Sequence, residues 1–126
     1  MKSLIIAIII GTATVLGSVG YTNHLEKISA DMVDKNNDIR NDIMSHNYSS
    51  AANKTREFSE YVREKRTILD AVGNHQELDE IERNLSELAA FAEDEMHGDA
   101  ISKCYSLDFL LRALPRNFKI KIENIL

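Results

Sequence analysis

The densest group of polar side chains lies in NHQELDEIERNL, residues 74–85. His75 and Asp79 are four positions apart, so on a helix they share one face, where an imidazole and a carboxylate could bind a metal ion together. Further ligands would have to come from nearby acidic residues: Glu77, Glu80 and Glu82. On this hypothesis the protein is a secreted or envelope metal-binding protein, or a small enzyme.

The same segment has a simpler interpretation as the start of a helix. Asn74 is a favourable N-cap, and Glu77, three residues later, completes a capping box. Acidic residues near a helix N-terminus are also favoured by the helix dipole. Because the segment lacks the two-histidine spacing of H-E-x-x-H, we favour capping and predict no catalytic, cofactor-binding or metal-binding residue.

Other parts of the sequence offer little chemistry. The run FAEDEMHGD, residues 91–99, lacks the ligand pattern of an EF-hand, and the four histidines share no spacing, although each lies near an expected helix end. The lone cysteine, Cys104, excludes an intramolecular disulfide, and its spacing from Ile101 and Leu107 predicts a buried core position. No nucleophile elbow, Walker lysine or C-x-x-C motif occurs, so we predict a protein that is not an enzyme.

The charge distribution argues against nucleic acid as a partner. The net charge is −5, and no basic stripe runs along the chain. One locally basic stretch lies within the second expected helix, with Lys54, Arg56, Arg63, Lys65 and Arg66. It either pairs with the acidic third helix or forms a docking face for an acidic partner.

The opening MKSLIIAIIIGTATVLGSVGYTNH raises the question of cleavage. Residues 4–21 are uncharged, and as a helix they measure about 27 Å, close to one bilayer core. The strongly apolar side chains contribute roughly −4 kcal/mol to insertion, partly offset by small and polar residues. Ser18-Val19-Gly20 suits signal peptidase, but the helical pattern continues unbroken. We therefore predict a retained transmembrane anchor, residues 1–22, with secretion after cleavage near Gly20 as the alternative.

Charges flanking the span predict its orientation. The amine of Met1 and Lys2 precede it, whereas acidic residues outnumber Lys27 just after it: Glu26, Asp31 and Asp34. The positive-inside rule then places the N-terminus in the cytoplasm and the C-terminal domain outside the cell membrane. A narrow stripe of small residues along the span, Ala7, Gly11, Thr14 and Ser18, either allows self-association or, as we favour, reflects how common small residues are in membrane helices.

Apolar spacing predicts an all-α fold, in which the transmembrane helix leads into an antiparallel bundle of three to four helices over residues 23–126. The helices are expected at 23–46, 50–72, 75–97 and 99–114. Gly73 and Gly98 are expected to end the second and third helices, with Asp99 capping the next, and Pro115 to end the fourth. The tail, residues 115–126, alternates apolar residues with lysines, which predicts an extended strip over the bundle.

Three segments together resemble a known family. They are the N-terminal span, H-x-E-L-D-E-I-E (His75 to Glu82), and the ending F-L-L-x-x-L-P (Phe109 to Pro115) followed by K-I-x-I-E-N-I-L (Lys119 to Leu126). This combination resembles the domain of unknown function 4363 family, small proteins of clostridial and other spore-forming bacteria. The resemblance implies a membrane-anchored helical domain and assigns no activity. We therefore expect a non-catalytic interaction or scaffold module of the cell envelope, which binds an envelope protein or itself.

Overall fold

The computed structural model describes residues 1–70 and 75–125, with only the backbone for 118–122 and 125. The described residues form helices and turns without a strand, which confirms the predicted all-α fold. The helices are α1 (Lys2–Met44), α2 (Tyr48–Asp70), α3 (His75–Glu93) and α4 (His97–Ile125). The expected caps Gly73 and Asn74 lie outside the described residues.

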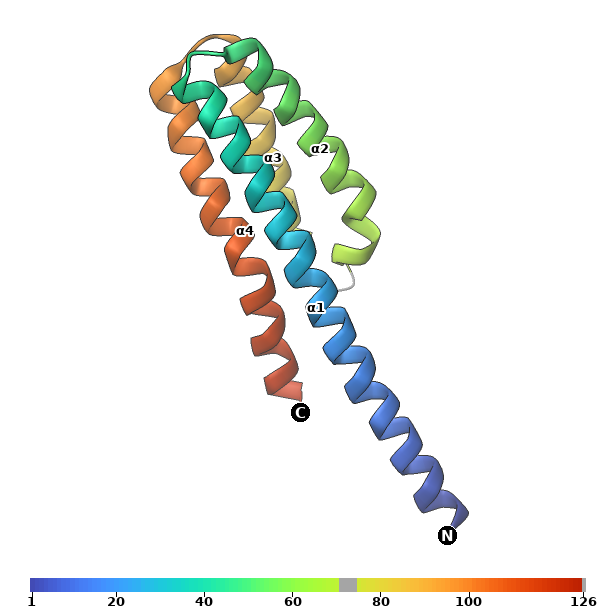
Figure 1. The fold of residues 1–126 in the computed structure, drawn as a ribbon. Helices are drawn as coiled ribbons and strands as arrows, with labels where there is room; N and C mark the ends of the chain where they lie inside the picture. Colours follow the sequence, from blue (N-terminus) through green and yellow to red (C-terminus); the bar gives the residue numbers. More distant parts are fainter. Residues whose placement is uncertain (71–74, 126) are drawn as a thin grey trace.

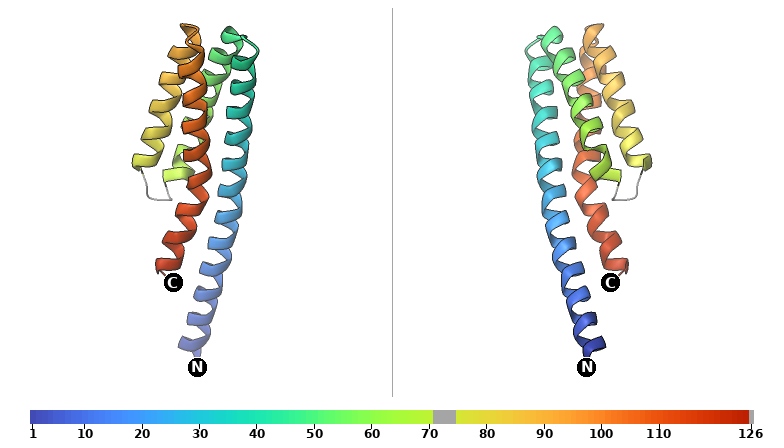
Figure 2. Two further views of the ribbon diagram at one scale, coloured as in Figure 1. Left: turned by 90° about the vertical axis from the view of Figure 1, so that its left-hand side faces the viewer. Right: turned by 90° about the vertical axis from the view of Figure 1, so that its right-hand side faces the viewer.

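The four helices form a bundle in which α1 packs against α2 and α4, and α3 packs against the same two helices (Figures 1 and 2). Each helix turns its apolar stripe inward, as its sequence spacing predicts. The largest fully buried side chains come from all four helices: Phe58, Leu25, Met32, Ile39, Ile43, Leu69, Leu78, Ile81, Leu85, Leu88, Leu107 and Leu111. Cys104 is buried with them, in agreement with its predicted core position.

Two matching turns close the end of the bundle farthest from the N-terminus (Figure 1). At each turn a non-glycine residue takes the left-handed conformation, His46 with φ 59° and Glu95 with φ 57°. The amide of the next residue bonds back five positions, Asn47 to the carbonyl of Asp42 and Met96 to that of Phe91, both at 2.8 Å. This is the Schellman pattern that satisfies the last carbonyls of a helix.

The position of the second turn corrects a prediction. Gly98 was expected to end the third helix, with Asp99 capping the next, but α3 ends at Glu93 and α4 begins at His97. Glu95 takes the left-handed position that glycine usually occupies, so Gly98 lies within the first turn of α4. The backbone hydrogen bonds of the turn stabilise this conformation without glycine.

The predicted extended tail is also wrong, because α4 continues through Pro115 to Ile125. A proline within a helix has no N–H to donate to the carbonyl four residues earlier, here that of Leu111. The hydroxyl of Ser29 on α1 donates to this carbonyl at 2.7 Å. Tertiary packing thus supplies a hydrogen-bond donor in place of the missing one, and Leu111 and Leu114 keep α4 in the core.

A second buried hydrogen bond fixes the register of α1 and α4. Asn36 Nδ2 donates to the carbonyl of Cys104 at 2.8 Å. Seven residues separate Ser29 from Asn36 on α1, and seven separate Leu111 from Cys104 on α4, so the two helices run in opposite directions in constant register. A slip by one turn would break both hydrogen bonds and leave polar groups buried without partners.

At the opposite end, α2 and α3 stop while α1 continues. The hydroxyl of Tyr21 donates to the carbonyl of Ile68 near the end of α2, and Asn117 on α4 donates to the carboxylate of Glu77 in the first turn of α3. Below this level α4 continues for about two more turns, and α1 then projects alone toward the N-terminus (Figures 1 and 2).

Candidate functional site

The candidate metal pair of the alternative hypothesis, His75 and Asp79, does not converge on a common point. Asp79 accepts a hydrogen bond from Arg66 at 2.8 Å, whereas Nδ1 of His75 lies 3.2 Å from the carboxylate of Asp70. Within residues 1–70 and 75–125, no group of three histidine, cysteine or acidic side chains is placed to hold a metal ion. Both side chains therefore take part in contacts between α2 and α3.

Arg66 is the centre of that contact. Besides Asp79, its guanidinium lies 2.9 Å from Glu82 on α3 and 3.6 Å from Asp70 on its own helix. Hydrogen bonds to Asp79 and then Glu82 raise the pKa of Arg66 above its usual range. The guanidinium thus sits among three carboxylates and neutralises part of the charge that could otherwise attract a cation.

Other basic residues of α2 pair in the same way. Arg56 forms an ion pair with Glu93 on α3, and Lys54 lies 2.9 Å from Asp42 on α1. The pKa of Asp42 is lowered, first by the hydroxyl of Ser50, which donates to it at 2.7 Å, and then by Lys54. These contacts favour the interpretation in which the basic side chains of this stretch pair with neighbouring helices. They do not favour a docking face for an acidic partner.

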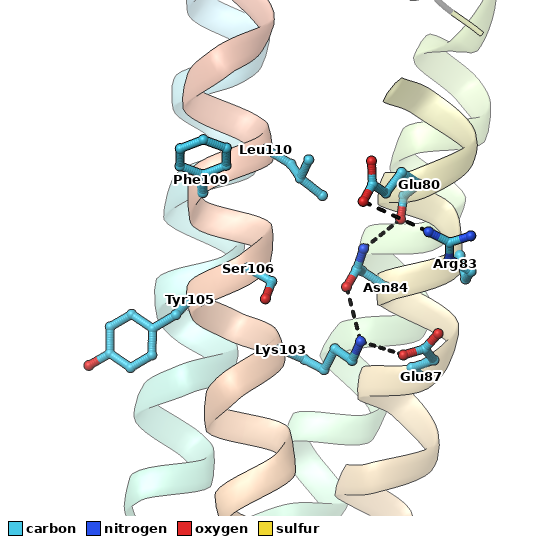
Figure 3. A pocket seen from close by; sticks show the side chains of 9 residues that line it. All are labelled: Glu80, Arg83, Asn84, Glu87, Lys103, Tyr105, Ser106, Phe109 and Leu110. Carbon is cyan, nitrogen blue, oxygen red and sulfur yellow. Dashed lines mark hydrogen bonds and ion pairs between the residues drawn. The ribbon is translucent and has the colours of Figure 1, made fainter. Parts of the chain in front are cut away.

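A groove of about 890 Å³ runs between α3 and α4 (Figure 3). Lys103 crosses it, with Nζ 2.5 Å from Glu87 and 3.4 Å from the amide oxygen of Asn84. The ammonium of Lys103 lowers the pKa of Glu87. Figure 3 shows Tyr105 and Phe109, which line the groove on its α4 side, with their rings directed away from α3. The charged side chains in the groove are paired with one another, and its lining contains no histidine or cysteine.

Sequence reasoning missed one cluster, at the closed end of the bundle. The hydroxyl of Tyr48 lies 2.9 Å from Nδ1 of His46 and 3.0 Å from Nδ1 of His97, and the two imidazoles stack with centroids 5.0 Å apart. In the neutral state one imidazole accepts from the hydroxyl while the other donates to it. The cluster ties the α1–α2 turn to the start of α4. Its only sequence signal was the position of both histidines near helix ends.

The N-terminal half of α1 has the largest exposed apolar surface of the described chain. Its large apolar side chains are between 53% and 67% exposed: Leu4, Ile5, Ile6, Ile8, Ile9, Ile10, Val15, Leu16 and Val19. Of the described helices, α1 is the one long and apolar enough to cross a membrane, a property that signal sequences share. An apolar surface of this extent marks a membrane or protein contact.

Three hydroxyl groups in and next to this half donate to carbonyls of their own helix. Thr14 donates to the carbonyl of Ile10 at 2.8 Å, Ser18 to that of Thr14 at 2.9 Å, and Thr22 to that of Ser18 at 2.8 Å. A hydroxyl that bonds back to its own helix loses less free energy on leaving water. The polar residues that dilute the span are thus compatible with a hydrocarbon environment.

Comparison with known proteins identifies the family. The model of the domain of unknown function 4363 (DUF4363) matches residues 19–125, from the end of the apolar segment to the last turns of α4. The chain therefore belongs to this family, as the resemblance of its sequence segments predicted. No curated protein and no solved structure matches the chain.

Proposed function

We propose that this member of the domain of unknown function 4363 family is a membrane-anchored, non-catalytic interaction module of the cell envelope. Residues 4–21 of α1 span the bilayer, and residues 23–126 form the bundle outside it. The observation that carries the proposal is the continuity of α1, in which an exposed apolar half leads without a break into a half buried in the bundle core.

The start of the chain supports an orientation with the bundle outside the cell. Lys2 and the amine of Met1 form a short positive region before the apolar segment, the arrangement that directs a following domain across the membrane. The continuous helix through Gly20 supports retention of the segment, because signal peptidase cleaves extended chain.

One observation supports a non-catalytic role, and another supports interaction. Charged side chains in the bundle pair with one another between helices, as Arg66 does with Asp79 and Glu82. Meanwhile α4 presents Tyr105 and Phe109 to solvent one turn apart, 61% and 68% exposed. Exposed aromatic residues are enriched among those that dominate protein–protein binding. A second copy or another envelope protein fits this face.

Intact mass and membrane extraction test the anchor. We expect the native protein to remain with membranes after carbonate washing and to have the mass of the chain with residues 1–20 present. A mature protein that begins at Tyr21, or that fractionates as a free soluble species, contradicts the proposal and supports secretion.

Cysteine labelling tests the orientation. In a Cys104→Ala background, Ser102→Cys places a single thiol on an exposed position of α4. We expect a membrane-impermeant maleimide to label this thiol from outside the cell. In a host that has an outer membrane, this membrane is permeabilised first. Labelling that needs lysis of the cytoplasmic membrane would reverse the orientation.

Site-specific photocrosslinking tests the interaction. A benzophenone amino acid at Phe109 should form a discrete crosslinked product in cells, and the same group at Arg63, exposed on α2, serves as the control. Absence of a product specific to position 109, together with a monomer in detergent, contradicts the interaction role.

A further inference from the structure

The register of α1 and α4 sets the depth of the last turns of α4. Ser29 lies opposite Leu111, and both helices rise about 1.5 Å per residue. Ile125, fourteen residues beyond Leu111, is therefore level with Val15, fourteen residues before Ser29. By the same count, residues 119–125 are level with 15–21, which belong to the proposed span.

The rest of the bundle stops short of this depth. The contact of Tyr21 with Ile68 marks the lower end of α2, and the contact of Asn117 with Glu77 marks that of α3. Figures 1 and 2 show α4 continuing beyond this level toward the N-terminal half of α1. If Tyr21 marks the outer edge of the hydrocarbon core, the end of α4 reaches about 9 Å below that edge, since six residues of helix separate Val15 from Tyr21.

The sequence of these turns suits a lipid interface. Phe118, Ile122 and Ile125 follow the 4, 3 spacing that places them on one side of a helix. Residues 116–125 contain three basic residues and one acidic residue, whereas the whole chain carries −5. Long basic side chains beside a membrane span extend toward the headgroups, where an anionic surface attracts each Lys or Arg.

We propose that residues 116–125 of α4 form a second membrane contact, which lies in the outer leaflet beside the span of α1 and binds anionic headgroups. The inference rests on the proposed function, because the depth is defined relative to the anchor. The bundle is then attached to the bilayer at two points, by the span and by the end of α4.

Fluorescence quenching can measure this depth cleanly, because the chain contains no tryptophan. The full-length protein carries one tryptophan and is reconstituted into vesicles of phosphatidylethanolamine and phosphatidylglycerol with a nitroxide-labelled lipid. The test variants are Ile122→Trp and Asn124→Trp. Asn124 is exposed, so a larger side chain at this position should not disturb folding. Phe109→Trp, on the same helix above the lower ends of α2 and α3, is the matched control, and Val15→Trp reports the anchor.

We expect a label near the headgroups to quench the fluorescence of Ile122→Trp and Asn124→Trp clearly more than that of Phe109→Trp. Phe109→Trp should keep its fluorescence, and replacing phosphatidylglycerol with phosphatidylcholine should weaken the quenching at 122 and 124. Quenching at Val15 without quenching at 122 or 124 overturns the inference and leaves the anchor intact. Absence of quenching at Val15 overturns the proposed function itself.

Discussion

The hydroxyl of Ser29 donates to the carbonyl of Leu111, the backbone acceptor that Pro115 deprives of its usual helical donor. The two residues are 82 positions apart in the chain, yet their atoms lie 2.7 Å apart in the buried contact between α1 and α4. A serine on one helix thus makes a proline tolerable on another. This relationship yields a test of coupling between the two helices.

Ser29→Ala should lower the free energy of unfolding by about 1–3 kcal/mol, because it removes the donor to a buried carbonyl. In a Pro115→Ala background residue 115 can again donate to Leu111, so the same serine substitution should cost about 1 kcal/mol or less. Urea denaturation of the bundle in detergent, for the four variants of this double-mutant cycle, measures the difference. Equal costs in both backgrounds would show that the serine does not compensate for the proline.

Glu95→Gly should raise the free energy of unfolding by about 0.5–1 kcal/mol. Glu95 holds a left-handed conformation that is unfavourable for a side chain with Cβ and favourable for glycine. The matched control is Asp94→Gly, one position earlier and outside the left-handed region, which should lower stability. Thermal melts of the two variants should therefore shift in opposite directions.

Cys104 should resist thiol reagents while the protein is folded. Burial raises the pKa of its thiol to about 11, so at pH 8 roughly one thiol in a thousand is ionised, and access is blocked as well. We expect slow reaction with a disulfide reagent in detergent and fast reaction in urea. Ser102→Cys in the Cys104→Ala background is the exposed control. Equally fast labelling of both folded proteins would indicate that α4 separates from α1.

The contact of Ser50 with Asp42 should make stability depend on acidic pH. Because the folded pKa of Asp42 is lowered, its stabilising contribution is present above the unfolded pKa, near 3.8, and is lost as pH falls through the folded value. Ser50→Ala should therefore be less stable than the native protein at pH 7. This difference in stability should disappear as the pH falls through the folded pKa of Asp42. Ser49→Ala, at the exposed neighbouring position, should show no such pH-dependent difference.

Ile8→Arg should release the protein from membranes. Ile8 lies about 7 Å from the middle of residues 4–21, so an arginine there costs less than the about 3 kcal/mol of a span centre but still removes a large part of the modest driving force of this segment. Carbonate extraction should move a large share of the variant to the soluble fraction, while Ile8→Leu stays with the membrane. Retention of Ile8→Arg would show that the bundle, or its end on α4, suffices for membrane binding.

Much of the bundle could be predicted from apolar spacing, because buried positions such as Phe58, Leu85 and Leu107 repeat at helical intervals. The predicted core position of Cys104 followed from the same pattern. What failed were rules for helix ends. Gly98 and Pro115 are strong local signals, but the backbone bonds around Glu95 and the hydroxyl of Ser29 outweighed them. Such contacts come from distant segments or from exact backbone geometry.

The candidate site shows the same limit. The spacing of His75 and Asp79 was visible in the sequence, but their partners, Asp70 and Arg66, lie on another helix. The cluster of His46, Tyr48 and His97 joins segments that are 49 positions apart. A single sequence reports which side chains share a helix face and leaves open which helix they meet.

The unbroken course of α1 has a mechanical consequence in the proposed topology. From Tyr21 to Met44 the helix forms a stiff lever arm of about 35 Å, fixed at one end to the transmembrane segment. A bilayer that thins and tilts that segment by about 15° would swing the far end of the bundle sideways by roughly 9 Å. Lipid thickness would thereby be converted into a displacement of the surface that meets other molecules.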